Sequence, residues 1–442
     1  MSELKRELNL TEATTLNMID MVGIGPFIVV PLVIQELHGP YSLYAWLLGA
    51  LLAFVDGMVW AELGAAMPYA GGSYVFLKEI FGKDRWGKYF SFLFIWQTTF
   101  QAPLVVASGA IGFAQYFTYL IPLSYWQQKT VSGSLVIFLI FLLYRRIKTI
   151  GKISVILGVG VIGTILWIIV SGFLNFNTSY FTDVSGIDIS FSSLFFIALG
   201  NASIKTVYTY LGYYNVCHLG GEIQSPGINI PRSIRISIFG ITALYLMMQT
   251  SILGVVPWQE AMKSQFIVSL FFEKIYGETA AIAATALILW IAFASLFAVL
   301  LGYSRIPYAA AIDGNFFKPF GKLHPAKNFP HISLLVLGSI AFIFSLLFRL
   351  KEVISAILAM RILVQFISQT LGIIKLRKEK PKEFFPYKMP LFPLPAILAA
   401  IIWLGLFYST GYFAFAGIGM MFLGTLVFLV KNKRSGDWPF NK

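Results

Sequence analysis

The stretch "MVGIGPFIVVP", residues 21–31, interrupts a segment that otherwise reads as a membrane-spanning helix. Gly23 and Gly25 alternate through it, and Pro26 follows directly. In hydrocarbon, a backbone group released from a helix costs several kcal/mol unless another group satisfies it. A broken helix is therefore tolerated in a membrane where its exposed backbone lines a cavity or binds another molecule.

The residue types in this stretch favour a binding site for an anion. Glycine has no side chain, so another molecule can approach the backbone closely. Pro26 suits the first turn of a restarting helix, because its missing N–H is not needed there. The restarted half-helix would point its positive N-terminal end at the gap. The alternative is a glycine packing face between helices, but that motif spaces small residues by four, whereas Gly23 and Gly25 are two apart.

The composition indicates an all-α polytopic membrane protein. Of its 442 residues, 57% are hydrophobic and 12% are charged, whereas soluble domains carry about 25% charged residues. No loop is long or polar enough to form a soluble domain, so we expect residues 1–442 to form one transmembrane unit. The apolar runs, which exceed the roughly 18 residues that suggest a spanning helix, predict twelve transmembrane helices at 13–37, 42–67, 88–117, 131–146, 153–174, 191–217, 233–257, 279–304, 332–348, 353–374, 391–408 and 412–430.

The positions of lysine and arginine predict the orientation. Of the 33 such residues, 26 fall in segments on the same side as the N-terminus and five fall on the other side. Because cytoplasmic loops carry the excess of positive charge, we expect cytoplasmic N- and C-termini in the plasma (inner) membrane. The net charge of +13 then reflects a cytoplasmic face near anionic lipid. Nucleic-acid binding is not expected, since the basic residues are not gathered on one soluble face.

The sixth predicted span, 191–217, contains a second candidate break. Many transporters consist of inverted repeats with interrupted helices at matching places. If repeat one covers about 13–174 and repeat two about 191–374, the sixth span mirrors the first, and helices at about 391–430 are additional. Between Tyr208 and Tyr214 the sixth span has four tyrosines and a glycine. Ordinary packing of these tyrosines, with their hydroxyls satisfied, is the alternative.

Four motifs together carry a resemblance to a known family. "GIGPF", residues 23–27, resembles a first-helix Gly-x-Gly-Ile-Phe motif with Pro26 in place of isoleucine. "AELGAAMPYAGGSYVFLKEIFG", 61–82, resembles the segment that closes the second helix, and "YTYLGYYNVCHLGGEIQSPGINIPRSI", 208–234, the sixth helix and its continuation. "YSRIPYAAAIDGNFFKPFGKLHP", 303–325, resembles the loop after the eighth helix. The chain thus resembles the amino acid–polyamine–organocation (APC) superfamily nearly end to end, and most closely its bacterial L-amino acid transporter-like branch.

The resemblance implies a fold and a function. The fold would be a five-plus-five inverted repeat with discontinuous helices 1 and 6 and two extra helices. The function would be secondary active transport of amino acids by alternating access, with no enzymatic activity and no cofactor. The substrate carboxylate would meet the N–H groups of Ile24 and Gly25, beside Gly23. Its ammonium would meet carbonyl groups of the first span and of the sixth span at Val207, Tyr208, Thr209 and Tyr210.

Other candidate residues follow from their positions. Tyr208 lies where the superfamily places an aromatic gate. The third, sixth, eighth and tenth spans would contact the substrate side chain. Candidate lining residues, for each of which interhelical hydrogen bonding or packing is the alternative, are Gln97, Gln101, Trp290, Ser295 and Gln365.

Ionisable residues inside spans are costly and are functional candidates. Asp20, Lys205 and His218 are candidates for gating or coupling, and Arg361 also lies within a span. Structural ion pairs are the alternative for all four. No lysine follows Lys152 in the fifth span, and 286–302 has a single hydroxyl residue. Many members of the superfamily that the chain resembles have a lysine in the fifth helix in place of a sodium ion, and sodium coupling would instead need hydroxyl groups on the eighth helix. Neither feature is present here, so both exchange and proton coupling stay open.

The expected substrates are neutral L-amino acids, because the pocket inferred from the sequence lacks acids. A cationic amino acid or polyamine carrier is the alternative, with Asp20 as its nearest carboxylate. A channel or a membrane enzyme is more distant, since neither polar rings nor a cluster of acid, base and nucleophile is present. No metal site is expected from the scattered histidines. Cys217 is the only cysteine, so we expect no disulfide-linked subunit, and the expected partners are the amino acid and the lipid bilayer.

Overall fold

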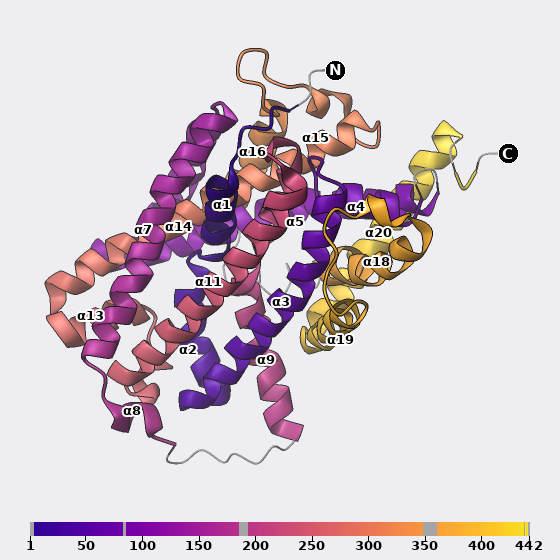
Figure 1. The fold of residues 1–442 in the computed structure, drawn as a ribbon. Coiled ribbons are helices and arrows are strands. Elements are labelled where there is room, and N and C mark those ends of the chain that lie inside the picture. The colour runs from indigo at the N-terminus through magenta and orange to yellow at the C-terminus, as the bar shows by residue number, and fades with distance from the viewer. Residues whose placement is uncertain (1–3, 83–84, 185–192, 348–359, 437, 441–442) are drawn as a thin grey trace.

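The computed structural model describes residues 4–82, 85–184, 193–347, 360–436 and 438–440. Within these ranges the chain is helical apart from its loops and two isolated β-bridges. Figure 1 shows a bundle of long helices, with the N-terminal segment before α1 at one end and α8 at the opposite end.

The first half of the chain contains eight α-helices and one 3-10 turn among the described residues. They are α1 (Leu10–Met21), α2 (Gly25–Leu37), η1 (Gly39–Tyr41), α3 (Ser42–Ala66), α4 (Ser73–Ile80), α5 (Trp86–Leu120), α6 (Tyr125–Leu143), α7 (Ile147–Leu174) and α8 (Thr178–Thr182).

The second half begins with another interrupted span and ends with two helices at the edge of the bundle. Its elements are α9 (Ser193–Tyr210), α10 (Asn215–His218), η2 (Gly220–Glu222), α11 (Pro226–Val255), α12 (Trp258–Ala261), α13 (Ile267–Tyr276), α14 (Glu278–Tyr303), α15 (Arg305–Ile312), η3 (Lys318–Gly321), α16 (His331–Leu347), the π-helical turn η5 (Ile362–Ile367), α18 (Ser368–Glu379), η6 (Lys382–Phe384), α19 (Leu394–Ser409) and α20 (Tyr412–Ser435).

The described helices form a multi-pass membrane protein. Seven of them are long and apolar enough to cross a bilayer, or eight if the bent pair α1 and α2 forms one span. Two shorter apolar helices, α16 and α19, accompany them. Residues 191–192 of the sixth predicted span and 353–359 of the tenth lie outside the described residues, so the count of twelve stays a prediction.

The start of α6 differs from its predicted position. The helix begins at Tyr125, six residues before the predicted span of 131–146. The Gln127 side chain accepts a hydrogen bond from the Ser124 N–H at 2.8 Å. This contact satisfies a backbone donor that would otherwise lack a partner at the helix N-terminus. The polar first turn, which has no hydropathy signal, therefore belongs to the helix.

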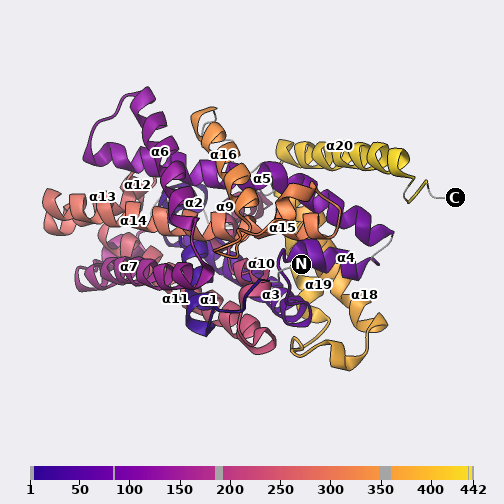
Figure 2. The same cartoon turned by 90° about the horizontal axis from the view of Figure 1, so that it is seen from above.

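The centre of the bundle contains both interrupted spans. The half-helix α2 packs against α9, and α1 packs against α10 and α11. The long helix α3 packs against α9 and α11, while α5 packs against α14 and α16. Seen from above, α20 runs along the outer edge of the bundle (Figure 2). Only 17% of an 18-residue apolar stretch of this helix is buried. The surface of α20 is thus available to lipid.

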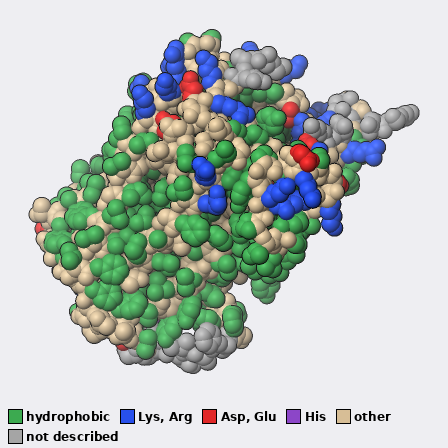
Figure 3. Space-filling model, viewed as in Figure 1, with side chains coloured by type: hydrophobic (Ala, Val, Ile, Leu, Met, Phe, Trp, Pro, Cys, Tyr) green, Lys and Arg blue, Asp and Glu red, His purple; other side chains and the backbone are tan. Residues whose placement is uncertain are grey.

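The surface separates charge from apolar area. Figure 3 shows hydrophobic side chains over the middle and lower part of this face, and lysine and arginine side chains over the end that carries the N-terminus. A bilayer would cover the apolar part, because charged side chains are costly in hydrocarbon. A cytoplasmic location of the basic end stays a prediction from the positive-inside pattern.

Candidate functional site

The first span is broken at the stretch that the sequence singled out. α1 ends at Met21, α2 begins at Gly25, and the two half-helices are bent by 43°. The Val22 N–H still donates to the Met18 carbonyl at 2.9 Å, and the helix resumes when the Ile28 N–H donates to the Ile24 carbonyl at 3.3 Å. Proline occupies the first turn of α2, as the sequence predicted for a restarting helix.

The break leaves backbone donors without partners. Within the described residues, neither the Ile24 amide nor the Gly25 amide donates a hydrogen bond. Pro26 has no N–H to offer. These two amides lie at the positive end of the α2 dipole, where an anion is stabilised. The geometry therefore provides two donors for a carboxylate.

The second break lies against the first. α9 ends at Tyr210 and α10 begins at Asn215, with Gly212 between them at a φ of +123°. A Cβ atom on Gly212 would lie 2.7 Å from the Met21 amide nitrogen. Any side chain at residue 212 would collide with the end of α1, so glycine is required for the two breaks to meet.

Two side chains hold the breaks together. The Tyr245 hydroxyl of α11 lies 2.8 Å from the Met21 carbonyl oxygen and 3.2 Å from the Thr209 carbonyl oxygen. The Asn17 side-chain oxygen accepts a hydrogen bond from the Val216 N–H at 2.9 Å. Buried backbone groups released by both breaks are thereby satisfied. Sequence reasoning missed Tyr245 and Asn17, whose only signal is that they are polar residues within apolar spans.

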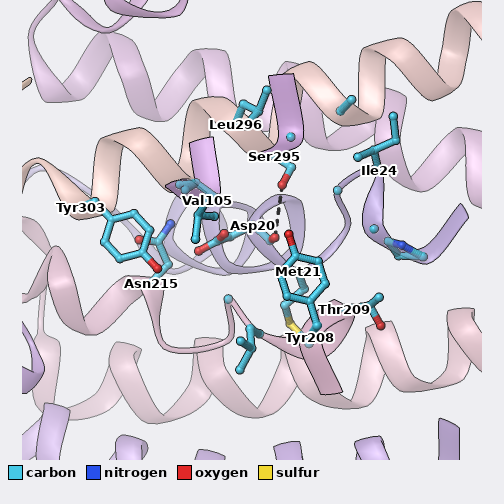
Figure 4. A pocket seen from close by; sticks show the side chains of 18 of the residues that line it. Asp20, Met21, Ile24, Val105, Tyr208, Thr209, Asn215, Ser295, Leu296 and Tyr303 are labelled. Atoms are coloured by element: carbon cyan, nitrogen blue, oxygen red, sulfur yellow. Dashed lines mark hydrogen bonds between the residues drawn. The ribbon is translucent and has the colours of Figure 1, made fainter. Parts of the chain in front are cut away.

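A cavity opens between the two breaks. Figure 4 shows Asp20, Tyr208 and Ser295 around this space, and the Ser295 hydroxyl donates to the Asp20 carbonyl at 3.3 Å. Helices α5 and α14 close its sides. The lining residues are Asp20, Met21, Gly23, Ile24, Gly25, Pro26, Val105, Gly109, Tyr208, Thr209, Leu211, Gly212, Tyr214, Asn215, His218, Ala292, Ser295, Leu296, Val299, Tyr303 and Arg361.

Several residues predicted from the sequence come together in this lining. Glycines 23 and 25, Ile24, Tyr208 and Thr209 are among them, as are Asp20, His218 and Ser295. A Cβ atom on Gly25 would lie 3.4 Å from the Tyr208 ring and 3.4 Å from the Thr209 methyl group. The candidate carboxylate site is thus directly beside the candidate aromatic gate.

Other predicted residues lie outside the lining. Val207 is buried, and Tyr210 packs edge-on against Trp46 and Tyr245. Trp290 is 38% exposed, and its indole N–H donates to the Leu157 carbonyl at 3.1 Å.

Three polar candidates contact the site only through another residue or not at all. Gln101 donates to the hydroxyl of the lining residue Tyr303 at 3.2 Å, so it contacts the cavity only through Tyr303. Gln97 is buried outside the lining. Lys205 pairs with Glu36 at 2.7 Å, which joins α9 to α2.

The sequence did not identify several lining residues, among them Asn215, Tyr303 and Val105. Their spans were predicted, but the sequence does not show which side of each helix faces the cavity. Arg361 was noticed as an arginine within a span, yet nothing placed it at the cavity. Gln365, one turn further along, holds that arginine instead of lining the cavity.

A multi-pass helical protein with two broken helices that face each other around a cavity has the architecture of a secondary transporter. Residues 8–430 match the family model described as amino acid permease. The chain belongs to this family, whose members are transporters and not enzymes.

Relatives within the family carry different substrate names. The chain is 26% identical to the serine/threonine exchanger SteT of Bacillus subtilis over 406 residues, which cover 90% of this chain and 89% of that protein. It is 25% identical to the branched-chain amino acid permease BcaP of Lactococcus lactis over 389 residues, covering 83% and 81%. It is 23% identical to mouse cationic amino acid transporter 4 over 408 residues, covering 86% and 61%.

Proposed function

We propose that this permease moves L-amino acids across the plasma (inner) membrane by alternating access. In the proposed topology, twelve spans form a five-plus-five inverted repeat, with repeat one at about 13–174, repeat two at about 191–374 and two extra helices at about 391–430. Both termini lie in the cytoplasm. The interruption of α1 and α2 and of α9 and α10 around one cavity supports this arrangement.

The observation that carries the proposal is the pair of free amides at Ile24 and Gly25. A substrate carboxylate at this position would receive two hydrogen bonds and the favourable end of the α2 dipole. The substrate ammonium would meet backbone carbonyls of the first and sixth spans, and the Asp20 carboxyl group, which lines the same cavity, could accept a hydrogen bond from it. Every α-amino acid carries this pair of charges, so the site would recognise the part that all amino acids share.

For the substrate side chain and the coupling mode, the proposal keeps the alternatives that the sequence offered. The sequence favoured neutral L-amino acids because no acid was expected at the pocket, and cationic amino acids or polyamines were its alternative. Asp20 and Arg361 both line the cavity, so an acid and a basic residue are present where the sequence predicted a pocket without acids. Exchange and proton-coupled transport are the two proposed modes, with Asp20 and His218 as coupling candidates. Lys205, paired with Glu36, would couple the outer halves α2 and α9 during gating.

Counterflow in proteoliposomes tests the proposal. Vesicles preloaded with an L-amino acid should accelerate uptake of labelled amino acid, whereas a channel gives no trans-acceleration and an enzyme changes the substrate chemically. The α-methyl ester of the best substrate should compete at least tenfold worse than the free acid, because it lacks the charge for charge-assisted hydrogen bonds. An ester that competes as well as the acid would show that the α2 N-terminus is not the carboxylate site.

The Tyr208 gate gives a second test. We expect Tyr208→Phe to keep most activity, because the ring excludes water and packs over the substrate. Tyr208→Ala should lower uptake per folded molecule on the order of tenfold, since the occluded state stays incomplete. Uptake is normalised to folded protein, with thermal stability of each variant measured alongside.

The control for the gate is Tyr408→Ala, because Tyr408 is 87% exposed at the end of α19. This variant should transport like the wild type. If Tyr208→Ala also matches the wild type per folded molecule, then Tyr208 only packs and the gate assignment is wrong.

A further inference from the structure

Arg361 is a buried cation in the cavity that the proposed recognition of the amino acid backbone does not use. It is 4% exposed and lines the cavity next to the π-helical turn η5. Arginine inside a membrane span is costly and usually has a partner or a function. Among the described residues, no ion pair includes Arg361.

The surrounding residues hold the guanidinium in one place. Its Nε donates to the Gln365 side-chain oxygen at 2.7 Å, and the Gln365 amide donates in turn to the Ser73 hydroxyl at 3.0 Å. The guanidinium carbon lies 5.2 Å from the centre of the Tyr214 ring and 5.8 Å from that of the Tyr303 ring. Cation–π contacts of this kind orient an arginine and stabilise its charge.

The partners of the Arg361 guanidinium are neutral groups. Its Nε donates to Gln365, and the hydroxyls of Tyr214 and Tyr303 also interact with the guanidinium. An arginine has five N–H donors in a rigid fork that matches a carboxylate. Arg361 is therefore oriented in advance, and among the described residues no carboxylate pairs with its charge.

The cavity combines several polar groups. The Ile24 and Gly25 amides are free donors, the Asp20 carboxyl group lines the cavity, and the Arg361 guanidinium is a cation. Asp20 interacts electrostatically with Arg361 but forms no ion pair with it. An amino acid with a carboxylate in its side chain supplies a second carboxylate, which can pair with the Arg361 guanidinium.

Other side chains fit the cavity less well. A neutral side chain would leave the buried Arg361 charge without an ion-pair partner, which is costly. A cationic side chain would face a like charge, which is repulsive. The complement of the cavity is thus an acidic amino acid.

We propose that Arg361 binds the side-chain carboxylate of the substrate, so that this permease selects acidic L-amino acids over their neutral amides. The inference rests on the proposed amino acid transport at this cavity and names the substrate class of that same site. It replaces the neutral class that the sequence favoured.

The test compares isosteric pairs in proteoliposomes that contain the full-length protein. Uptake and competition are measured for L-glutamate against L-glutamine and for L-aspartate against L-asparagine. In the wild type we expect at least one acid to be preferred over its amide on the order of tenfold or more, because hydrogen bonds to charged groups are the stronger ones. Arg361→Gln should remove this preference, and Arg361→Lys should keep part of it, because the charge remains without the fork.

The matched control is Lys205→Gln, which removes another cation within a span. Lys205 pairs with Glu36 outside the cavity lining, so any loss of uptake should affect acid and amide equally. The acid-to-amide ratio should therefore stay at the wild-type value.

Each outcome decides the inference. If the wild type takes amides as well as acids, or takes neutral amino acids only, the role of Arg361 is refuted while amino acid transport stands. If Arg361→Gln does not fold, the acid-to-amide ratios of the wild type and of Arg361→Lys still test the role of Arg361. If the wild type transports no amino acid of any class, the proposed function itself fails and the inference fails with it.

Discussion

Gly25→Leu abolishes substrate binding while the protein stays folded: this is the result that we expect if the break in the first span is the carboxylate site. A Cβ atom at residue 25 already lies 3.4 Å from the Tyr208 ring and the Thr209 methyl group. A leucine side chain would extend into the space in front of the free amides and fill it. Binding is measured by the thermal shift that a ligand of the folded state produces, and uptake by proteoliposome transport.

A second glycine provides the control for this variant. Gly163 lies in α7, and a Cβ atom there would meet no other atom within 4 Å. Gly163→Leu should therefore leave binding and transport unchanged, although it makes the same chemical change in a membrane helix. Normal transport by folded Gly25→Leu would show that the substrate does not approach this backbone.

The break itself could be predicted from the sequence because its physics is local. Gly23, Gly25 and Pro26 are poor helix formers, and in a membrane their freed backbone needs a partner. The position of the second break followed from the repeat symmetry that interrupted helices suggest. Both interruptions occur in the structure, between Met21 and Gly25 and between Tyr210 and Asn215.

The lining of the cavity could not be predicted, because it depends on how each helix is rotated about its axis. Gln101 and Trp290 lie at plausible depths, yet Gln101 faces Tyr303 and Trp290 faces α7. Nearly every face of a membrane helix is apolar, so the periodicity that locates a core face in soluble proteins carries little information here. Tyr245 is a similar case, since its contact with both breaks depends on how α11 packs against α1.

The end of the molecule that carries the N-terminus is closed by a buried ion pair. Arg305 Nε and Nη2 donate to the two carboxylate oxygens of Glu222 at 2.9 and 2.8 Å, and both side chains are at most 1% exposed. The Glu222 carbonyl accepts hydrogen bonds from the N–H groups of Glu7 and Leu8 at 3.0 and 2.9 Å. The pair thus joins the N-terminal segment, the continuation of α10 and the start of α15.

The neighbouring loops close the same region. The Gly71 N–H donates to the His218 carbonyl at 3.0 Å, and Ala70 forms a β-bridge with Leu219. Because His218 lines the cavity, these contacts lie just beyond it on the N-terminal side. In the proposed alternating-access mechanism, this region would separate when the cavity opens toward that side, and Glu222 and Arg305 would then move apart.

Glu222→Gln should destabilise this closed arrangement by about 3–5 kcal/mol, because removing one partner of a buried pair leaves the other charge without compensation. Arg305→Met should have a similar effect. The double variant should recover much of the loss, since replacing both partners by neutral groups removes the uncompensated charge. Thermal unfolding of the wild type, the two single variants and the double variant measures the coupling between the two residues.

The rate at which the single cysteine reacts with a thiol reagent distinguishes opening of this region from unfolding of the protein. Cys217 is 1% exposed in α10, and its thiol contacts the Trp60 carbonyl at 3.6 Å. If the Glu222–Arg305 pair holds this end of the molecule closed, Cys217 in each single variant should react faster with a thiol reagent well below the unfolding temperature, because α10 then separates from its neighbours. If both variants lose stability while Cys217 reacts at the wild-type rate, the pair only supports the fold. Additive losses in the double variant would likewise contradict direct coupling, since independent sites add whereas paired charges do not.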